Sequence, residues 1–196
     1  MESDINIEYF FATIKPLFGK FTQSQIDGIH CIIDKFEEQS VVLCRNQLAY
    51  ILATIHHETN KTFQPIEEYG KGKGKLYGGK FKINGKPYFK PDKIYYGRGF
   101  VQVTWYDNYK KLTEEAYLQG MVNWDFLNNP ELLLEKEKSK WACFVGMERG
   151  YFTGKRLDDY IKRDSWDFVN ARKIINGLDK AELIASYAKV YWEALR

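Results

Sequence analysis

The sequence lacks any long apolar run, so we expect no segment that spans a membrane. Hydrophobic residues make up 44% of the chain and charged residues 28%, a mixture typical of a globular domain. The first eight residues include three acids, Glu2, Asp4 and Glu8, where a secretory signal would be basic. We therefore expect the protein to be made and held in a cytoplasm.

Cysteine is also scarce, which excludes a fold held together by a disulfide framework. The three cysteines, Cys31, Cys44 and Cys143, are scattered along the chain, and none forms a Cys-x-x-Cys pair. We expect them to be buried free thiols.

Motifs for metals, nucleotides and covalent catalysis are missing as well. The run His57-Glu58-Thr59-Asn60-Lys61 begins like a zinc-protease helix, but Lys61 stands where the second histidine ligand would be. There is no Gly-x-Ser-x-Gly elbow and no phosphate loop, and Gly97-Arg98-Gly99 is too short for a dinucleotide fingerprint. We expect no metal, no cofactor and no nucleic-acid partner. His57 is expected to orient a neighbour or to pack, because it lacks a partnered nucleophile.

Helical periodicity is what the sequence does contain, over a length of 196 residues that suits one compact domain. Three amphipathic helices are predicted in the N-terminal part, at about 7–18, 22–36 and 46–59. Pro16 should kink or shorten the first helix, and Thr22 with Gln25 forms a capping box for the second.

The C-terminal half shows helical patterning again, and we expect four helices there. One follows Thr104, one begins near Pro130 with Asn129 as its cap, a short one covers 166–175, and the last begins at Asp179. The sequence thus predicts an α-rich single domain.

A loop region at about 60–93 interrupts the helical pattern. Alternating polar and apolar residues from Lys80 to Phe89, around Asn84-Gly85, predict a β-hairpin. Eight lysines and one acid, Asp92, lie between Lys71 and Lys93. They form either a solvated hairpin or a surface that attracts an anionic polymer. Inserts of this length are usually functional.

Glu58 is a charged residue in an apolar position. It lies three residues after Ile55, on the same helical face as Leu48, Ile51 and Leu52. Partial desolvation and the negative end of the helix dipole both favour the protonated form of a carboxyl group there, as a general acid requires. Alternatively, Glu58 only ends the helix and points to water.

Two more carboxylates follow on the loop that leaves this helix. Glu67 and Glu68 come after the apolar anchor Phe63 and the stiff Pro65. A helix-borne acid that faces a loop-borne carboxylate across a groove is what hydrolysis of a glycosidic bond requires. The alternative is that Glu67 and Glu68 are ordinary surface charges.

The segment from Tyr95 to Tyr109 combines flat apolar side chains with amides and hydroxyls. Glycines on both sides of Arg98 let the backbone pass close to another group. Aromatic rings beside amide and hydroxyl groups suit sugars with acetamido substituents. A buried strand would explain the aromatic residues but not the polar residues Arg98, Gln102, Thr104 and Asn108 together.

Three separated motifs resemble glycoside hydrolase family 19, the chitinase-like fold of the lysozyme superfamily, and within it the short endolysins of phages and prophages. The motifs are His57-Glu58-Thr59, then Tyr95-Tyr96-Gly97-Arg98-Gly99 continuing to Gln102-Val103-Thr104-Trp105 and Asn108-Tyr109, and finally Ile174-Ile175-Asn176-Gly177. The stretch 62–70 also resembles the phage subgroup, in which the second carboxylate directly precedes an aromatic residue. Plant members differ, because they carry glycines after the catalytic glutamate and are disulfide-bonded.

The resemblance implies a mainly α, lysozyme-like α+β fold in which a long loop and a small hairpin flank a substrate groove. It implies that Glu58 is the general acid, Glu68 the general base and Thr104 a hydroxyl that holds the attacking water, with Glu67 as the alternative base. The residues implied to bind sugar are Tyr96, Arg98, Gln102, Asn108 and Asn176. Family members invert the anomeric centre, which predicts a carboxyl separation of roughly 6.5 to 9.5 Å.

The function implied is that of an endolysin, which cuts the β-1,4 bond between N-acetylmuramic acid and N-acetylglucosamine in peptidoglycan and so lyses the host. The protein is expected to wait in the host cytoplasm as a monomer, until another protein permeabilises the membrane and gives it access to the periplasm and cell wall. A chitinase acting on poly-N-acetylglucosamine is the closest alternative. A domain that binds cell-wall sugar without cutting it is an alternative of another class.

Overall fold

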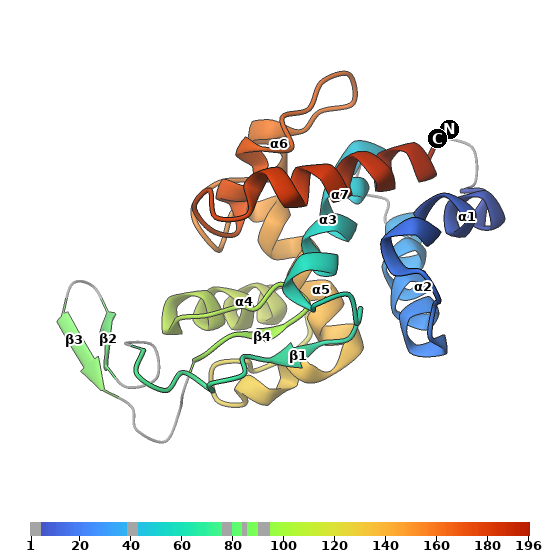
Figure 1. The fold of residues 1–196 in the computed structure, drawn as a ribbon. Coiled ribbons are helices and arrows are strands. Elements are labelled where there is room, and N and C mark those ends of the chain that lie inside the picture. The colour runs from blue at the N-terminus through green and yellow to red at the C-terminus, as the bar shows by residue number, and fades with distance from the viewer. Residues whose placement is uncertain (1–4, 39–42, 76–79, 84–85, 90–94) are drawn as a thin grey trace.

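A computed structural model of the protein describes residues 5–38, 43–75, 80–83, 86–89 and 95–196, and helices dominate it (Figure 1). Three helices come first: α1 (Ile7–Phe18), α2 (Gln23–Glu38) and α3 (Arg45–Glu58). Four short strands follow: β1 (Ile66–Glu67), β2 (Lys80–Ile83), β3 (Lys86–Phe89) and β4 (Arg98–Gly99). The remaining elements are α4 (Tyr106–Leu118), the 3-10 helix η2 (Pro130–Leu134), α5 (Lys136–Arg149), α6 (Leu157–Tyr160), the 3-10 helix η3 (Asn170–Ile174) and α7 (Ala181–Ala194). The predicted mainly α class is confirmed.

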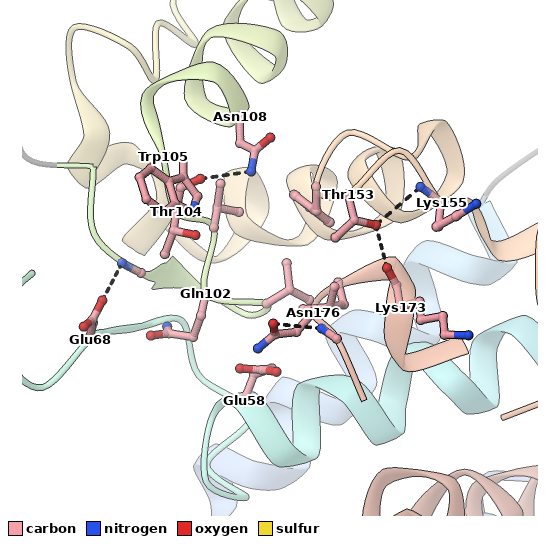
Figure 2. A pocket seen from close by; sticks show the side chains of 16 residues that line it. Glu58, Glu68, Gln102, Thr104, Trp105, Asn108, Thr153, Lys155, Lys173 and Asn176 are labelled. Carbon is pink, nitrogen blue, oxygen red and sulfur yellow. Dashed lines mark hydrogen bonds between the residues drawn. The ribbon is translucent and has the colours of Figure 1, made fainter. Parts of the chain in front are cut away.

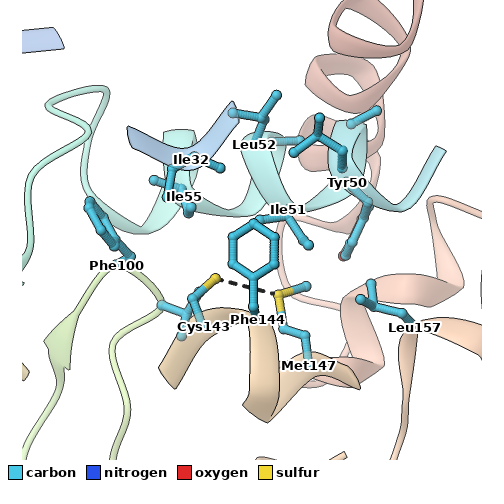
Figure 3. Packing of buried hydrophobic residues seen from close by; sticks show 14 of the residues in the cluster. Ile32, Tyr50, Ile51, Leu52, Ile55, Phe100, Cys143, Phe144, Met147 and Leu157 are labelled. Carbon is cyan, nitrogen blue, oxygen red and sulfur yellow. Dashed lines mark hydrogen bonds between the residues drawn. The ribbon is translucent and has the colours of Figure 1, made fainter. Parts of the chain in front are cut away.

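Helix α3 lies at the centre of the fold. Every residue from Asn46 to His56 is buried, whereas the sequence predicted one apolar stripe. The reason is that neighbours cover it on more than one side. Helix α7 packs along it, and Phe144 and Met147 of α5 face its residues Ile51 and Ile55 (Figure 3). A helix held on several sides gives Glu58, its last residue, a rigid support.

The three N-terminal helices agree with the sequence prediction. Pro16 lies in the last turn of α1, which ends two residues later, at Phe18. The capping box of α2 is present: the Gln25 backbone N–H donates to Thr22 Oγ1 at 3.2 Å, and the Thr22 N–H donates to Gln25 Oε1 at 2.8 Å.

The structure corrects the prediction around Pro130. The predicted helix is two elements, η2 and α5, joined at Glu135. Asn129 precedes η2, but its side chain does not cap it. The Asn129 amide instead donates to the carbonyl oxygen of Asp125, which ties it to the preceding turn.

The two last predicted helices also need correction. Trp166 pairs with Ile161 in an isolated β-bridge, so only η3 remains of the helix predicted at 166–175. Helix α7 begins at Ala181 and not at Asp179, because Lys180 adopts a left-handed conformation, with φ of 58°, that a helix cannot include. The four-residue helix α6 was not predicted.

The predicted hairpin is confirmed where the structure describes it. Strands β2 and β3 pair antiparallel, with Lys80 opposite Phe89 and Ile83 opposite Lys86, and lie at the end of the molecule away from α1 and α2 (Figure 1). The turn at 84–85 lies outside the described residues, as do the side chains from 76 to 94 and hence most lysines of the insert. Attraction of an anionic polymer to these lysines stays a prediction.

All three cysteines are free, as predicted; Cys44 and Cys143 are buried, but Cys31 is only partly so. Burial raises the pKa of the Cys143 thiol far above its usual range. In the part of the chain that the structure describes, no helix has the length and apolar character needed to cross a membrane.

His56 is a titratable residue buried between α3 and α7. Its Nδ1 lies 2.9 Å from the Tyr191 hydroxyl, and its ring stacks on Tyr187 with 4.2 Å between centroids. Nε2 has no hydrogen-bond partner among the described residues. Burial lowers the pKa of His56 to about 4, because an imidazolium there would lose its hydration.

The stability of the protein should therefore fall as the pH is lowered from about 6.5 to about 4. In this window the unfolded chain binds a proton at His56 and the folded chain does not, so acid favours unfolding by up to about 1.4 kcal/mol per pH unit. The free energy of unfolding in urea, measured across the window, should depend less steeply on pH in the His56→Gln variant. Equal slopes in the variant and the parent protein would contradict this assignment.

Candidate active site

A cavity of about 770 Å³ opens between the end of α3, the loops around β1 and β4, the start of α4 and the segments that precede α6 and follow η3 (Figure 2). Six of the predicted catalytic and sugar-binding residues line it: Glu58, Glu68, Gln102, Thr104, Asn108 and Asn176. Residues far apart in the sequence therefore meet at one hollow.

Glu58 reaches this cavity from the last position of α3. Its side chain is 15% exposed, and its Oε1 accepts a hydrogen bond from Arg172 Nη1 at 2.5 Å. Arg172 comes 114 residues later and is itself buried. The apolar stripe of the sequence did not predict this cation. Glu58 therefore neither points into bulk water nor lies in purely apolar surroundings.

The chain turns sharply after Glu58, and buried contacts hold that turn. Thr59 Oγ1 donates to the Ile55 carbonyl oxygen and accepts from the Phe63 N–H. Phe63 is fully buried, as its role of anchor predicts. A Cβ on Gly28 of α2 would lie 2.1 Å from the Phe63 carbonyl oxygen, so only glycine allows α2 to approach this turn so closely.

Glu68 comes to the cavity because β1 pairs with β4. In that antiparallel pair Glu67 lies opposite Arg98. One residue on, the Glu68 backbone N–H donates to the Gly97 carbonyl oxygen at 2.7 Å, and the Gly97 N–H donates to Glu68 Oε2 at 3.1 Å. The backbone of Gly97 therefore binds both the main chain and the carboxylate of Glu68, which sets the direction of that carboxylate.

Glu67 is not among the residues that line the cavity. Its Oε1 accepts from the Tyr96 hydroxyl at 3.1 Å, and its Oε2 lies 2.8 Å from Lys71 Nζ. Lys71 first, and the Tyr96 hydroxyl after it, lower the pKa of the Glu67 carboxyl. Successive residues of a strand point to opposite faces, which explains why Glu67 and Glu68 have different surroundings.

Thr104 lies between two residues with strained backbones. Gln102 has φ of 52° and Trp105 has φ of 74°, values that are uncommon for residues other than glycine. Gln102 Nε2 donates to the carbonyl oxygens of Ile66 and Gly99, and Asn108 Nδ2 donates to the Thr104 carbonyl oxygen at 3.0 Å. Strain of this kind costs of order 1–3 kcal/mol per residue and clusters at functional sites.

Tyr96 and Arg98 are both buried and do not line the cavity. The Arg98 guanidinium lies 3.6 Å from the centre of the Tyr96 ring, and its Nη1 donates to the Tyr109 hydroxyl at 3.1 Å. The two glycines approach different neighbours: a Cβ at Gly99 would lie 2.7 Å from Ser139 Oγ of α5, and a Cβ at Gly97 would lie 2.8 Å from Gln102 Oε1. The structure thus gives Tyr96 and Arg98 packing contacts beneath the site.

His57 is half-buried beside Glu58 and does not line the cavity. Burial lowers its pKa, although the Glu58 carboxylate acts in the opposite direction. Within the described ranges, no three His, Cys, Asp or Glu side chains come together in a group that could hold a metal ion.

One wall of the cavity consists of residues that were not predicted from the sequence. This wall carries Thr153, Lys155 and Lys173, which lie together at the right of Figure 2. Arg172, which contacts Glu58, does not itself line the cavity. The one signal in the sequence is that Lys173 directly precedes the motif Ile174-Ile175-Asn176-Gly177. No periodicity connects Thr153 and Lys155 to that motif.

The fold of the chain is similar to that of a protein of known structure. No protein-family model matches the chain. Among solved structures, the fold is similar to that of a bacterial family 19 chitinase, whose published description reports differences from the plant enzymes. The TM-score is 0.51 at 16% sequence identity, and the match covers 94% of this chain and 93% of that one. The chain therefore has a mainly α fold like that of a family 19 chitinase over nearly its whole length.

Proposed function

We propose that this protein is a phage-type endolysin, a glycoside hydrolase that cuts the β-1,4 bond between N-acetylmuramic acid and N-acetylglucosamine in peptidoglycan. The observation that carries the proposal is that Glu58 and Glu68, from separate elements, line one cavity together with Thr104. Two carboxylates across a groove are the requirement of glycosidic hydrolysis. The similarity of the fold to a family 19 chitinase supports the same class of reaction.

In the proposed mechanism Glu58 is the general acid. Arg172 binds Oε1, whereas Oε2 makes no hydrogen bond with a described residue. Oε2 is therefore the oxygen that would carry the proton to the leaving glycosidic oxygen. The hydrogen bond from Arg172 would hold the protonated carboxyl group in position before the reaction, and the Arg172 charge would stabilise the carboxylate formed after it.

Glu68 is the proposed general base and Thr104 the hydroxyl that positions water. Glu68 would take a proton from that water while the oxygen attacks the anomeric carbon from the face opposite the leaving group, which inverts the centre. The exposed ring of Trp105, at 43% exposure beside Thr104, offers a flat apolar face for a sugar ring. Gln102, Asn108 and Asn176 offer amides for its acetamido group.

Chitin is the second candidate substrate. It is supported by the fold similarity, because the protein compared is a chitinase. The same residues would perform the same chemistry on poly-N-acetylglucosamine.

For the endolysin we propose a cytoplasmic pool that reaches the cell wall after another protein permeabilises the membrane. The endolysin function predicts that the protein lowers the turbidity of permeabilised Gram-negative cells. Activity on chitin alone would reject that function.

Substitutions of Glu68 and Glu67 show which of the two carboxylates is the general base. Glu68→Gln should lower kcat on peptidoglycan about 100-fold, because the amide cannot accept the proton from water. Glu67→Gln is the matched control, one residue away and outside the cavity, and should keep most of the activity. The rate of each variant is measured as the appearance of new reducing ends in purified glycan strands. A larger loss in Glu67→Gln than in Glu68→Gln would reverse the assignment.

A further inference from the structure

Two lysines stand on the cavity wall that sequence reasoning missed. Lys155 and Lys173 both line the cavity, on the side away from Glu68 and Trp105 (Figure 2). They come from segments that meet only in the folded chain, one before α6 and one in η3. The proposed hydrolysis uses neither of them.

Thr153 joins the two segments. Its hydroxyl donates to the carbonyl oxygens of Lys173 at 2.6 Å and Ile174 at 3.1 Å. The Lys155 backbone N–H donates to the same hydroxyl oxygen at 3.4 Å. One hydroxyl group therefore fixes the backbone that carries each lysine.

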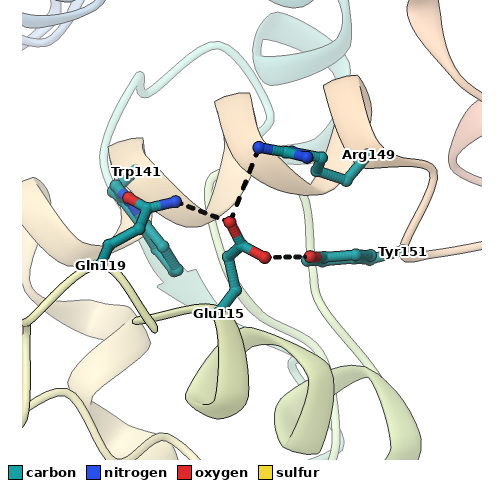
Figure 4. A network of polar contacts seen from close by, with 5 residues as sticks. All are labelled: Glu115, Gln119, Trp141, Arg149 and Tyr151. Carbon is teal, nitrogen blue, oxygen red and sulfur yellow. Dashed lines mark hydrogen bonds and ion pairs between the residues drawn. The ribbon is translucent and has the colours of Figure 1, made fainter. Parts of the chain in front are cut away.

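A polar network holds a nearby residue of the same segment, Tyr151, against α4. Its hydroxyl donates to Glu115 Oε2 at 2.5 Å, and Glu115 Oε1 accepts from Gln119 and lies 3.8 Å from Arg149 (Figure 4). The Tyr151 hydroxyl is the main reason why the pKa of the Glu115 carboxyl is lowered. Contacts with α4 therefore hold the segment that carries Thr153 and Lys155 in place.

The ammonium groups of Lys155 and Lys173 form no ion pair with any residue in the described ranges. Of the acids that line the cavity, Glu58 is paired with Arg172, and Glu68 lies on the opposite side (Figure 2). Asp167 lies close enough for Lys173 to contribute to its lowered pKa, but hydrogen bonds from Asn170 are the larger cause. Two cations without an ion pair therefore stand at the edge of the cavity.

We propose that Lys155 and Lys173 bind a carboxylate of the substrate and so favour peptidoglycan over a neutral glycan. This inference rests on the proposed hydrolase function. Poly-N-acetylglucosamine carries no charge, so two ammonium groups gain nothing from it. Peptidoglycan carries carboxylates on the stem peptide and, where that peptide has been removed, on the lactyl group of N-acetylmuramic acid. Both sources present the same group to the two lysines.

The test compares one glycan in charged and neutral form. Soluble glycan strands with stem peptides are digested before and after their carboxylates are converted to methylamides with methylamine and a carbodiimide. The parent protein should have a kcat/KM about fivefold higher on the untreated strands, the effect of ion pairs of about 1 kcal/mol. In the Lys155→Met/Lys173→Met variant the ratio should fall to about one. The control Lys20→Met/Lys189→Met, with two exposed lysines away from the cavity, should keep the ratio of the parent.

A ratio that stays the same in the Lys155→Met/Lys173→Met variant, or a parent protein that does not distinguish the two substrates, would overturn the inference. Strands stripped of stem peptides by an amidase carry only the lactyl carboxylate, which hydrolysis of the amide bond sets free. A preference for the charged form of these strands shows that the two lysines also bind a lactyl carboxylate, and no preference limits the contact to the stem peptide. The proposed function fails separately, if the parent protein cuts none of these strands or if Glu58→Gln cuts them equally well.

Discussion

The Glu58→Gln variant should lose about 1000-fold of kcat on peptidoglycan, because an amide of the same shape cannot donate a proton to the leaving oxygen. The variant should still fold, since the introduced amide retains an oxygen that can accept the hydrogen bond from Arg172 Nη1. Release of reducing ends measures the rate, and near-ultraviolet circular dichroism checks the packing of the core.

Glu182→Gln is the control for this substitution. Glu182 lies in the first turn of α7 and is exposed, so its loss should leave kcat unchanged. A Glu58→Gln variant that keeps its activity would remove the general acid from the mechanism. A variant that has lost its near-ultraviolet signal would indicate instead that Glu58 has a structural role.

The second large effect should come from Arg172→Met. It would leave the Glu58 carboxylate, only 15% exposed, without its cation, and would remove the hydrogen bond from Arg172 Nε to the Asp179 carbonyl oxygen. Breaking a buried ion pair in this way costs about 3 kcal/mol. The free energy of unfolding in urea should fall by that amount, and kcat should fall with it because Glu58 is no longer held in position.

A double-mutant cycle separates the ion pair from packing. If the cost arises from the unpaired carboxylate, Glu58→Gln/Arg172→Met should be more stable than Arg172→Met alone. Additive effects of the two substitutions would mean that Glu58 and Arg172 do not stabilise one another. The variant Arg172→Lys, which keeps the charge but has a different shape, should lie between the parent protein and Arg172→Met.

Local patterns in the sequence predicted the helices well where neighbouring residues decide the structure. The capping box of Thr22 and Gln25 and the hairpin strands of 80–89 are of this kind. The prediction failed where a distant contact decides. Trp166 looked helical by its spacing, but its pairing with Ile161 and its contact with Trp192, ring centroids 4.9 Å apart, hold it in another conformation.

The site shows the same division. Glu58, Glu68 and Thr104 were predicted from short motifs, and all three line the cavity. Arg172 and Lys155 could not be predicted, since contacts between segments far apart in the chain place Arg172 against Glu58 and hold the segment of Lys155 against η3. Tyr96 and Arg98 belong to a motif, yet they pack below the site, because a motif includes buried residues as well as those that touch a ligand.

The configuration of the first product tests the central claim most directly. Purified peptidoglycan strands are digested in the NMR tube. Proton spectra record the anomeric configuration of the new reducing end before the two anomers equilibrate. Direct attack of a water held by Glu68 and Thr104 predicts that the α-anomer of N-acetylmuramic acid appears first. A β-anomer as first product, or no new reducing end at all, would contradict the account.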